Sequence, residues 1–329
     1  MNYYLNKIIN TSKHKLLCFV NYFKQLIYSY YYCSPLRYNN TKVFAICCIA
    51  KCENDYIREF IEYHISIGFN KIYIYDNNDI DGERFEDVIQ DYIKKNIVKI
   101  IDYRGRSQCQ TIAYNDCYKK YNKDFDWILF IDCDEFFTTT TNNNVPELLN
   151  KKIYKYFQIL HINWMVYDDN NLLDNDGRKV IERFTRPKTP FNYRKTNSWH
   201  TFPDNYHIKS LIRGNLKHIN WLSAESPHTP KSLFYKCANL SGNKCEANSP
   251  FATLDYSIGY LRHYTTKTIG EYIKIKMKRG FPDQPIEKAL KKLTLDAFFE
   301  INERTPEKES YIKQLTQEHE YKNSICTSK

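Results

Sequence analysis

Residues 128–136 read ILFIDCDEF, an apolar run that ends abruptly in acidic residues. The apolar part is typical of a strand buried on both faces of a parallel sheet. Asp132 and Asp134 stand two residues apart, so their side chains share one side of an extended chain. Carboxylate oxygens are the ligands that suit Mn²⁺ and Mg²⁺. The stretch therefore predicts a cation site at the end of a buried strand. The alternative is that both aspartates only cap a loop or a helix.

Strand-helix alternation precedes this stretch. Strands are predicted by apolar, β-branched runs at residues 43–49, 71–75, 97–101 and 127–131. Helices are predicted by apolar residues at helical spacing in residues 56–67, 85–94 and 107–121. Gly68 is expected to end the first helix and Ser107 to cap the third. This alternation predicts an α/β fold with a parallel sheet flanked by helices, where ligands bind at the carboxyl ends of the strands.

The second half of the chain is less regular. Residues 157–166 and 180–184 are expected to be strands, separated by a turn-rich segment. Residues 190–260 contain few periodic runs. Helices are expected at 268–280 and 285–302, with Pro282 and Pro285 between them.

The chain has 48 Lys and Arg against 38 Asp and Glu, a formal charge of +10. Such a balance favours anionic partners, namely nucleic acid, acidic lipid or a phosphate-bearing substrate. No zinc-finger, homeodomain or RNA-binding signature accompanies the charge, which argues against nucleic acid. The 11 cysteines are scattered, and adjacent Cys47 and Cys48 lie in an apolar run. Buried thiols and a cytoplasmic location are the expectation.

Residues 16–33 are apolar and aromatic but too short and too polar for a confident spanning helix. They lack the small-residue cleavage site of a signal peptide. An amphipathic helix that packs on the body or on a partner is one interpretation. The other is peripheral contact with a membrane surface through residues 1–35, helped by the lysines at positions 7, 13, 15 and 24.

Four segments carry a family resemblance: CCIAKCEND at 47–55, FIEYHISIGFNKIYIYDNN at 60–78, QTIAYNDCYKKY at 110–121 and DWILFIDCDEFF at 126–137. In this order they resemble glycosyltransferases of the GT-A fold, close to families 2 and 92. The resemblance implies a mostly parallel, helix-flanked sheet, an irregular acceptor region and C-terminal helices. It implies a metal-assisted, inverting transfer of a sugar from a nucleotide-diphosphate sugar, expected to be a UDP-sugar, to a hydroxyl of a glycan or glycolipid.

The expected domains follow from this resemblance. Residues 1–41 form an N-terminal amphipathic segment. Residues 42–265 form the glycosyltransferase domain, with a nucleotide-sugar half at 42–140 and an acceptor half at 141–265. Residues 266–329 form a helical extension. The alternative function is a noncatalytic protein that binds nucleic acid or a membrane surface through its positive charge.

Donor-binding roles are expected for residues at the strand ends and on the third helix. By resemblance, the base and ribose contact Ala50, Lys51, Glu53, Asp76 and Asn78, although Asp76 also suits a turn. Polar residues of the third helix, Gln110 and Asn115, either line the donor site or make ordinary hydrogen bonds on the helix face. Asp132 contacts the donor through its metal. Lys209 and Arg213, four residues apart, either clamp a diphosphate or form a solvated basic face.

The remaining roles rest on residue chemistry. His228 is favoured over His263 as third ligand of Mn²⁺ or Mg²⁺ beside Asp132 and Asp134. Asp169, with Glu182 as second choice, is expected to be the catalytic base that takes the acceptor's proton. Trp164 either stacks on a sugar ring or packs in the core.

Overall fold

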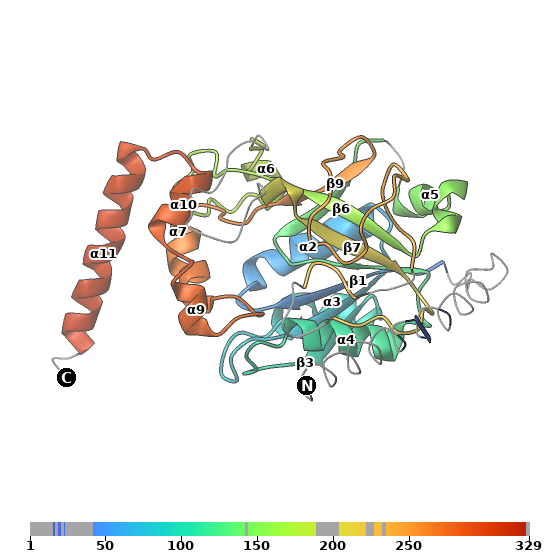
Figure 1. The fold of residues 1–329 in the computed structure, drawn as a ribbon. Helices are drawn as coiled ribbons and strands as arrows, with labels where there is room; N and C mark the ends of the chain where they lie inside the picture. Colours follow the sequence, from blue (N-terminus) through green and yellow to red (C-terminus); the bar gives the residue numbers. More distant parts are fainter. Residues whose placement is uncertain are drawn as a thin grey trace, which may run out of the picture.

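The computed structural model describes residues 42–141, 144–188, 204–221, 227–231 and 235–326, together with Leu16, Phe19, Val20 and Phe23. A nine-stranded sheet forms its centre, in the order β3-β2-β1-β4-β7-β6-β9-β5 with β8 paired to β6 (Figure 1). The strands are β1 (Phe44–Ala50), β2 (Lys71–Asp76), β3 (Val98–Asp102), β4 (Trp127–Phe130), β5 (Glu135–Thr139), β6 (Ile159–Val166), β7 (Ile208–Arg213), β8 (Cys237–Asn239) and β9 (Gly259–His263). Among these strands β5 and β7 run opposite to the rest.

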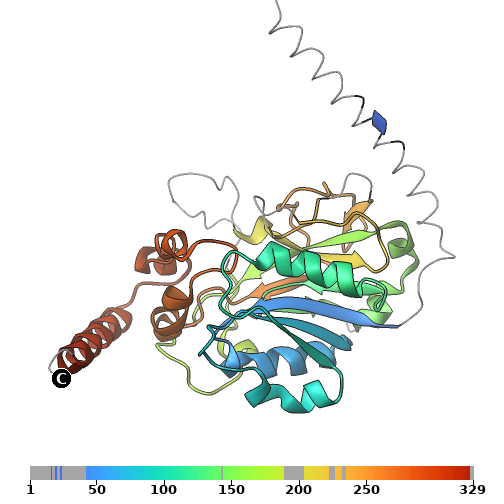
Figure 2. The same cartoon turned by 90° about the horizontal axis from the view of Figure 1, so that it is seen from below.

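The first half is the predicted parallel unit. Its helices are α2 (Asn54–Ser66), α3 (Glu86–Lys94) and α4 (Gln110–Tyr121). β1 is buried along its whole length and alternates between two cores. Ile46 packs with α2 and α3, whereas Cys47 packs with α4. Figure 2 shows α4 on one side of these strands and the other two helices on the opposite side. Each large apolar side chain buried this way contributes about 1.5–3 kcal/mol. The α/β fold class is confirmed.

Two local predictions about helix ends have different outcomes. Gly68 follows α2 with a φ of +106°, and a Cβ there would lie 2.5 Å from Cδ of Pro146, so a glycine is required at this turn. The prediction of Ser107 as the cap of α4 is wrong. That helix begins at Gln110 with Cys109 in the capping position, because the backbone N–H of Cys109 is held by the carbonyl of Pro282 instead of entering the helix earlier.

The second half departs further from the predictions. Residues 180–184, predicted as a strand, contain the short helix α6 (Val180–Arg183). The carboxylate of Glu59 on α2 accepts hydrogen bonds from the backbone N–H groups of Val180 (2.7 Å) and Ile181 (3.2 Å), which stabilises a helix start there. The region expected to be irregular contributes β7, which pairs with both β4 and β6. β5 follows Asp134 directly and pairs with β9.

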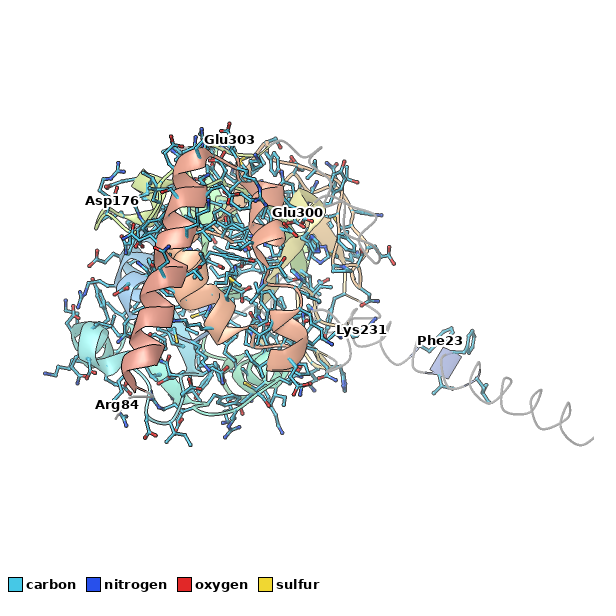
Figure 3. All side chains as sticks on the ribbon, turned by 90° about the vertical axis from the view of Figure 1, so that its left-hand side faces the viewer. Phe23, Arg84, Asp176, Lys231, Glu300 and Glu303 are labelled. Carbon is cyan, nitrogen blue, oxygen red and sulfur yellow. The ribbon has the colours of Figure 1, made fainter. Side chains whose placement is uncertain are left out.

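The remaining helical segments complete the fold. Between β5 and β6 lie α5 (Val145–Leu149) and the short segment η2 (Lys152–Tyr156), and η3 (Asp204–Tyr206) precedes β7. At the C-terminal end, α7 (Ile269–Glu271), the π-helical η4 (Tyr272–Lys276) and α8 (Met277–Arg279) run on without interruption. They are followed by α9 (Ile286–Leu290), α10 (Leu295–Ile301) and α11 (Pro306–Cys326). In Figure 3 these helices stand in front of the sheet, with Glu300 and Glu303 near the passage from α10 to α11.

The N-terminal prediction lies almost wholly outside the described residues. Leu16, Phe19, Val20 and Phe23 are assigned to a helix, and their side chains are exposed. None of the helices in the described part of the chain has the length and hydropathy needed to cross a bilayer.

Candidate active site

Polar side chains gather where the parallel strands end. Ala50, Asp76 and Asp102 are aligned in register at the carboxyl ends of β1, β2 and β3. Asp76 accepts hydrogen bonds from the backbone and side-chain amides of Asn78 (2.9 and 2.8 Å), and Arg104 pairs with its other oxygen at 2.8 Å. The sequence predicted this edge of the sheet from its strand endings.

Asp132 lies one residue beyond the buried Ile131, at the end of β4. One carboxylate oxygen accepts a hydrogen bond from Nε2 of Gln110 at 2.9 Å. The other lies 2.7 Å from Nζ of Lys209 on β7. Burial acts to lower the pKa of Lys209, but Asp132 and Glu135 together raise it above its usual range. Lys209 is therefore a buried cation beside Asp132, and the pairing of β7 with β4 brings it there.

Glu135 is a third carboxylate at the same position. Its side chain is fully buried, and Oε2 accepts the backbone N–H of Asp132 at 2.9 Å. Oε1 has no hydrogen-bond partner among the residues that the structure describes. Burial raises the pKa of Glu135 well above its usual range, against the opposing influence of Lys209. An orphaned buried oxygen of this kind indicates that a ligand or a proton completes the site.

Asp134 faces the C-terminal helices. Its carboxylate lies 3.5 Å from Nζ of Lys276 and 3.8 Å from Nε2 of His263. Burial acts to raise the pKa of Asp134, but Lys276 and the surrounding cations hold it below its usual range. Burial lowers the pKa of His263 to about 4, so its imidazole is neutral near pH 7. Lys276 is therefore the principal partner of the Asp134 carboxylate.

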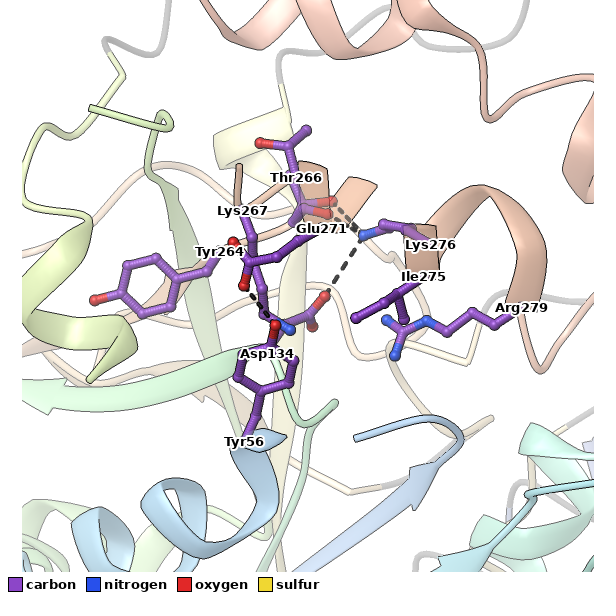
Figure 4. A pocket seen from close by; sticks show the side chains of 10 residues that line it. Tyr56, Asp134, Tyr264, Thr266, Lys267, Glu271, Ile275, Lys276 and Arg279 are labelled. Carbon is purple, nitrogen blue, oxygen red and sulfur yellow. Dashed lines mark hydrogen bonds and ion pairs between the residues drawn. The ribbon is translucent and has the colours of Figure 1, made fainter. Parts of the chain in front are cut away.

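A polar pocket opens beside Asp134 (Figure 4). Three cationic side chains line it, those of Lys267, Lys276 and Arg279. The other lining residues are Tyr56, Asp134, Tyr264, Thr265, Thr266, Glu271 and Ile275. Arg279 and Lys267 both pair with Glu53, the latter at 3.3 Å. The pocket thus concentrates positive charge next to a carboxylate at the strand ends.

The π-helical segment η4 positions the charged side chain of Lys276 at the pocket. Five residues, Tyr272–Lys276, form the π-turn between α7 and α8. Such π-turns occur frequently at functional sites because the extra residue per turn shifts the side chains that follow. Lys276, the last of them, points to Asp134 and to the carbonyl and hydroxyl of Thr265. Burial lowers its pKa to about 8.

A buried ion pair forms the rear of the pocket. Both terminal nitrogens of Arg183 bind both carboxylate oxygens of Glu271, at 2.8 and 2.9 Å. Tyr56 donates to the same carboxylate at 2.5 Å. Glu271 also closes a capping box with Thr268 at the start of α7. Residues from α2, α6 and α7 are thereby joined directly behind Lys276.

An aromatic cluster lies on the other side of His263. The indole of Trp164 stands 4.1 Å from the ring of His263 and 4.9 Å from each of the rings of His207 and His228, measured between centroids. Nζ of Lys209 lies 5.9 Å from the same indole. Trp164 thus lies between the surroundings of Asp132 and Asp134 and the region predicted to hold the acceptor. Its side chain is only partly buried.

Several predicted site residues do not meet at this pocket. Arg213 pairs with Trp127 at the opposite end of β4, because β7 is antiparallel, and it binds the carbonyls of Phe157 and Tyr154. The Asn115 amide bonds twice to the main chain of Trp221. Neither residue lines the pocket, and donor contact by Arg213 and Asn115 stays a prediction without support from its geometry.

The two predicted bases also lie elsewhere. Asp169 is fully buried and pairs with Lys308 at 2.6 Å, and it accepts the backbone N–H of Asn171. Glu182 is exposed on α6. Neither side chain lines the pocket of Figure 4. Their assignment as bases stays a prediction without support from the pocket geometry.

The histidine beside Asp134 is His263, whereas the sequence favoured His228. Nδ1 of His228 lies 2.9 Å from the carbonyl oxygen of Ile208, and the ring packs against Trp164. His263 reaches Asp134 because β9 pairs with β5, which places it opposite Glu135. That pairing joins residues far apart in sequence, so spacing alone could not reveal it.

Lys51 and Glu53, predicted to contact the base, lie on the loop after β1. Lys51 pairs with Asp79 at 2.7 Å, and its carbonyl accepts a hydrogen bond from Arg279 at 3.0 Å. Reasoning from sequence missed Lys267, Glu271 and Arg183. The only available signal was the basic density near residues 267–292 and the Lys276–Arg279 spacing.

Comparison with known proteins agrees with this architecture. A model of glycosyltransferase family 92 matches residues 44–297. The chain belongs to glycosyltransferase family 92. The resemblance stated from the sequence is confirmed. This family 92 chain is 30% identical over 106 residues to a family 92 protein of Oryza sativa subsp. japonica, covering 32% of the chain and 18% of the relative. A family 92 protein of Ricinus communis is 29% identical over 125 residues, covering 36% and 21%.

The matched segments thus span about a fifth of the length of these curated relatives. Among solved structures, S. aureus TarS 1–349 in complex with UDP-GlcNAc aligns with a TM-score of 0.35 at 13% identity, covering 82% of this family 92 chain and 78% of that one.

Proposed function

We propose that this chain is a glycosyltransferase that moves a sugar from a nucleotide-diphosphate sugar to a hydroxyl of a glycan or glycolipid acceptor. The observation that carries the proposal is the pocket in which Lys267, Lys276 and Arg279 surround Asp134. It lies beside the strand ends where α/β sheets bind their ligands. Membership of family 92 supports the same reaction class.

The cationic pocket suits the diphosphate of the donor. Arginine offers paired N–H groups that match phosphate oxygens, and lysine adds point charge. When the glycosidic bond to the donor breaks, negative charge develops on the leaving diphosphate. Fixed cations in a partly enclosed site stabilise that charge without reorganisation. Lys276 and Arg279 are the residues proposed for this role. In the ligand-free chain Asp134 balances Lys276, and Glu53 balances Arg279.

The base and ribose of the donor are proposed to lie along the ends of β1 and β2, at Ala50, Asp76 and Asn78. A UDP-sugar remains the expected donor. Gln110 and Lys209 are proposed to act indirectly, because both hold Asp132. Trp164 is proposed as the surface on which the acceptor sugar rests, since indole rings stack on the apolar faces of sugars.

A divalent cation, Mn²⁺ or Mg²⁺, is proposed as cofactor. By chemistry the residues fit it, because Asp132 and Asp134 supply carboxylate oxygens, His263 an imidazole and Glu135 an unpartnered oxygen. In the ranges that the structure describes, no three such side chains converge as a preformed metal site. Lys209 and Lys276 instead neutralise the two aspartates. A bound ion would supply further positive charge to the leaving diphosphate.

Inversion at the sugar, with Asp169 or Glu182 as base, stays a prediction, as do a cytoplasmic location and membrane-surface contact through residues 1–35. The noncatalytic alternative rests on net charge alone. No specific observation at the pocket favours it.

The test is a thermal-shift and hydrolysis screen of the full chain with UDP-sugars and Mn²⁺. A bound donor should raise the melting temperature by mass action. Lys276→Met should weaken donor binding by roughly 10- to 150-fold, the loss of one charged hydrogen bond of about 1.5–3 kcal/mol. Lys278→Met is the matched control, because Lys278 is exposed two residues away on α8.

Asp132→Asn and Asp134→Asn should abolish Mn²⁺-stimulated turnover in the same assay. Two results would overturn the proposal. One is the absence of stabilisation by any nucleotide sugar. The other is salt-sensitive DNA binding without nucleotide binding, which would favour the noncatalytic alternative.

A further inference from the structure

Two cysteines face each other on a short hairpin away from the pocket. Cys237 begins β8, and the chain returns past it after the turn at Gly242. The backbone N–H of Asn239 donates to the carbonyl of Asn243 at 2.9 Å, and that of Cys245 donates to the carbonyl of Cys237 at 3.0 Å. These bonds define an antiparallel bridge between Ala238 and Lys244. Cys237 and Cys245 are therefore the next directly opposed pair, with side chains on one face.

This register has the spacing of a disulfide. Opposed residues of an antiparallel pair have Cα atoms about 4.5–5.5 Å apart. Disulfides span Cα separations of about 4.4–6.8 Å. Both cysteines are free thiols here, and the Cys245 thiol donates a hydrogen bond to the carbonyl of Asn243 at 3.6 Å. Cys237 is buried, whereas Cys245 is partly exposed. A bond between them would require little backbone movement.

His161 is a titratable neighbour of the partly exposed Cys245 thiol. The single hydroxyl proton of Thr229 is donated to the carbonyl of Ala247 at 2.9 Å. Nε2 of His161, 3.2 Å from that hydroxyl oxygen, must therefore donate to it. In a neutral imidazole this leaves the lone pair on Nδ1, which is buried and has no hydrogen-bond partner in the described ranges. The thiol of Cys245 itself donates to the carbonyl of Asn243 at 3.6 Å, and the nearby His161 ring lowers the pKa of that thiol.

This arrangement has the parts of an activated thiol. A nucleophile lies beside a base, and a third group orients the base. The neighbouring Cys237 thiol and then the His161 ring lower the pKa of Cys245 to about 5. The opposite holds for Cys52, which is also partly exposed, because burial raises its pKa. Exposure alone therefore does not account for the difference.

Other cysteine pairs in the chain lack this access. Cys47 contacts Cys117, and Cys48 contacts Cys133. All four side chains are enclosed between the sheet and its helices. Burial raises the pKa of Cys47, and contact with Cys48 together with burial raises that of Cys133. These pairs behave as core residues and serve as internal controls.

We propose that Cys237 and Cys245 form an oxidisable dithiol, in which Cys245 reacts first and Cys237 closes the disulfide. The oxidant class is a low-molecular-mass disulfide. The Cys245 thiolate attacks one of its sulfurs, which releases one thiolate and leaves a mixed disulfide on Cys245. Cys237 then loses its proton and attacks the Cys245 sulfur, which releases the second thiolate. The two protein thiols are oxidised, the small disulfide is reduced, and the two departing thiolates carry both protons.

The first experiment compares alkylation rates in the native full-length chain. Iodoacetamide at mildly acidic pH should modify Cys245 on the order of fivefold faster than Cys52, because a larger thiolate fraction outweighs its lower intrinsic nucleophilicity. His161→Gln should remove most of this difference while circular dichroism stays unchanged. Equal rates at Cys245 and Cys52 in the wild type would overturn the proposal.

The second experiment traps the products with oxidised glutathione. Trypsin cleaves after Lys236, Lys244 and Arg262, so a disulfide would join peptides 237–244 and 245–262 under nonreducing conditions. Cys237→Ser should stop the reaction at a glutathione adduct on Cys245, and Cys245→Ser should give neither product. Adducts confined to Cys52, or a Cys237→Ser chain without an adduct at Cys245, would refute the assigned order.

Discussion

Replacing Arg183 by methionine should destabilise the fold by about 3–5 kcal/mol, the usual result of removing one partner from a buried ion pair. The side chains of Arg183 and Glu271 are 1% and 4% exposed, and they are joined by two hydrogen bonds. Without Arg183, the Glu271 carboxylate keeps Tyr56 and Thr268 but loses its principal countercharge. The remaining cation nearby, Lys267, also pairs with Glu53.

The same reasoning predicts how the double variant behaves. Replacing both partners by methionine removes the uncompensated charge, and such replacements are often neutral or stabilising by about 1–4 kcal/mol. Arg183→Met with Glu271→Met should therefore recover much of the stability lost by either single change. It should not recover donor binding, because the capping box that starts the Lys276 helix is lost with Glu271.

Urea unfolding followed by circular dichroism measures these free energies. Arg178→Met is the matched control. Its partner Asp176 lies at 2.5 Å, but the two side chains are 54% and 36% exposed, so little change in the free energy of unfolding is expected. Burial acts to raise the pKa of Glu271, yet Arg183 and Lys267 lower it below its usual value. The ionised Glu271 carboxylate therefore contributes fully to stability above the usual carboxyl pKa. That contribution is lost as the pH falls through the lowered pKa of Glu271 in the folded chain. Single-variant losses under about 1 kcal/mol, or a double variant that loses the sum, would refute the reasoning.

Two further predictions concern buried titratable groups. Burial lowers the pKa of His64 from 6.5 to about 3, so stability should fall as pH drops from 6.5 towards 3, and His64→Leu should flatten that slope in urea titrations at several pH values. Lys308→Met should destabilise the fold by about 3–5 kcal/mol because Asp169 would be left buried without its partner. If Asp169 is structural, Asp169→Asn together with Lys308→Met should restore stability and retain turnover, whereas loss of turnover in a stable double variant would support Asp169 as the base.

The first half of the fold was predictable because its signals are local. Each of β1 to β4 is a short apolar run, and each intervening helix repeats apolar residues on one face. In a parallel sheet such runs must lie side by side, so the strand ends at Ala50 and Asp76 followed from the pattern. The second half gave weaker signals. β9 is five residues long and alternates buried with partly exposed positions, and β7 lies between polar loops.

The residues of the site were likewise predictable only where their sequence signal is local. Asp132 and Asp134 were found because they immediately follow a buried strand. Lys209 was named for a diphosphate clamp, and the structure instead gives it contact with Asp132. The position of His263 beside Asp134 could not be predicted, because it depends on β5 pairing with β9, a contact between residues more than 120 positions apart. The residues next to His228 in the sequence carried no information about that pairing.

The charges at the strand ends show why the two halves of the sheet must fold together. Asp132, Asp134 and Glu135 come from the first half, and burying three carboxylates without compensation would be prohibitive. Lys209 from β7 and Lys276 from the C-terminal helices provide the balancing cations. The first half alone would hold its acidic cluster in water and leave the apolar edge of β4 unpaired. Completion of the sheet by β7 is thus the same event that encloses the site and charges it for an anionic ligand.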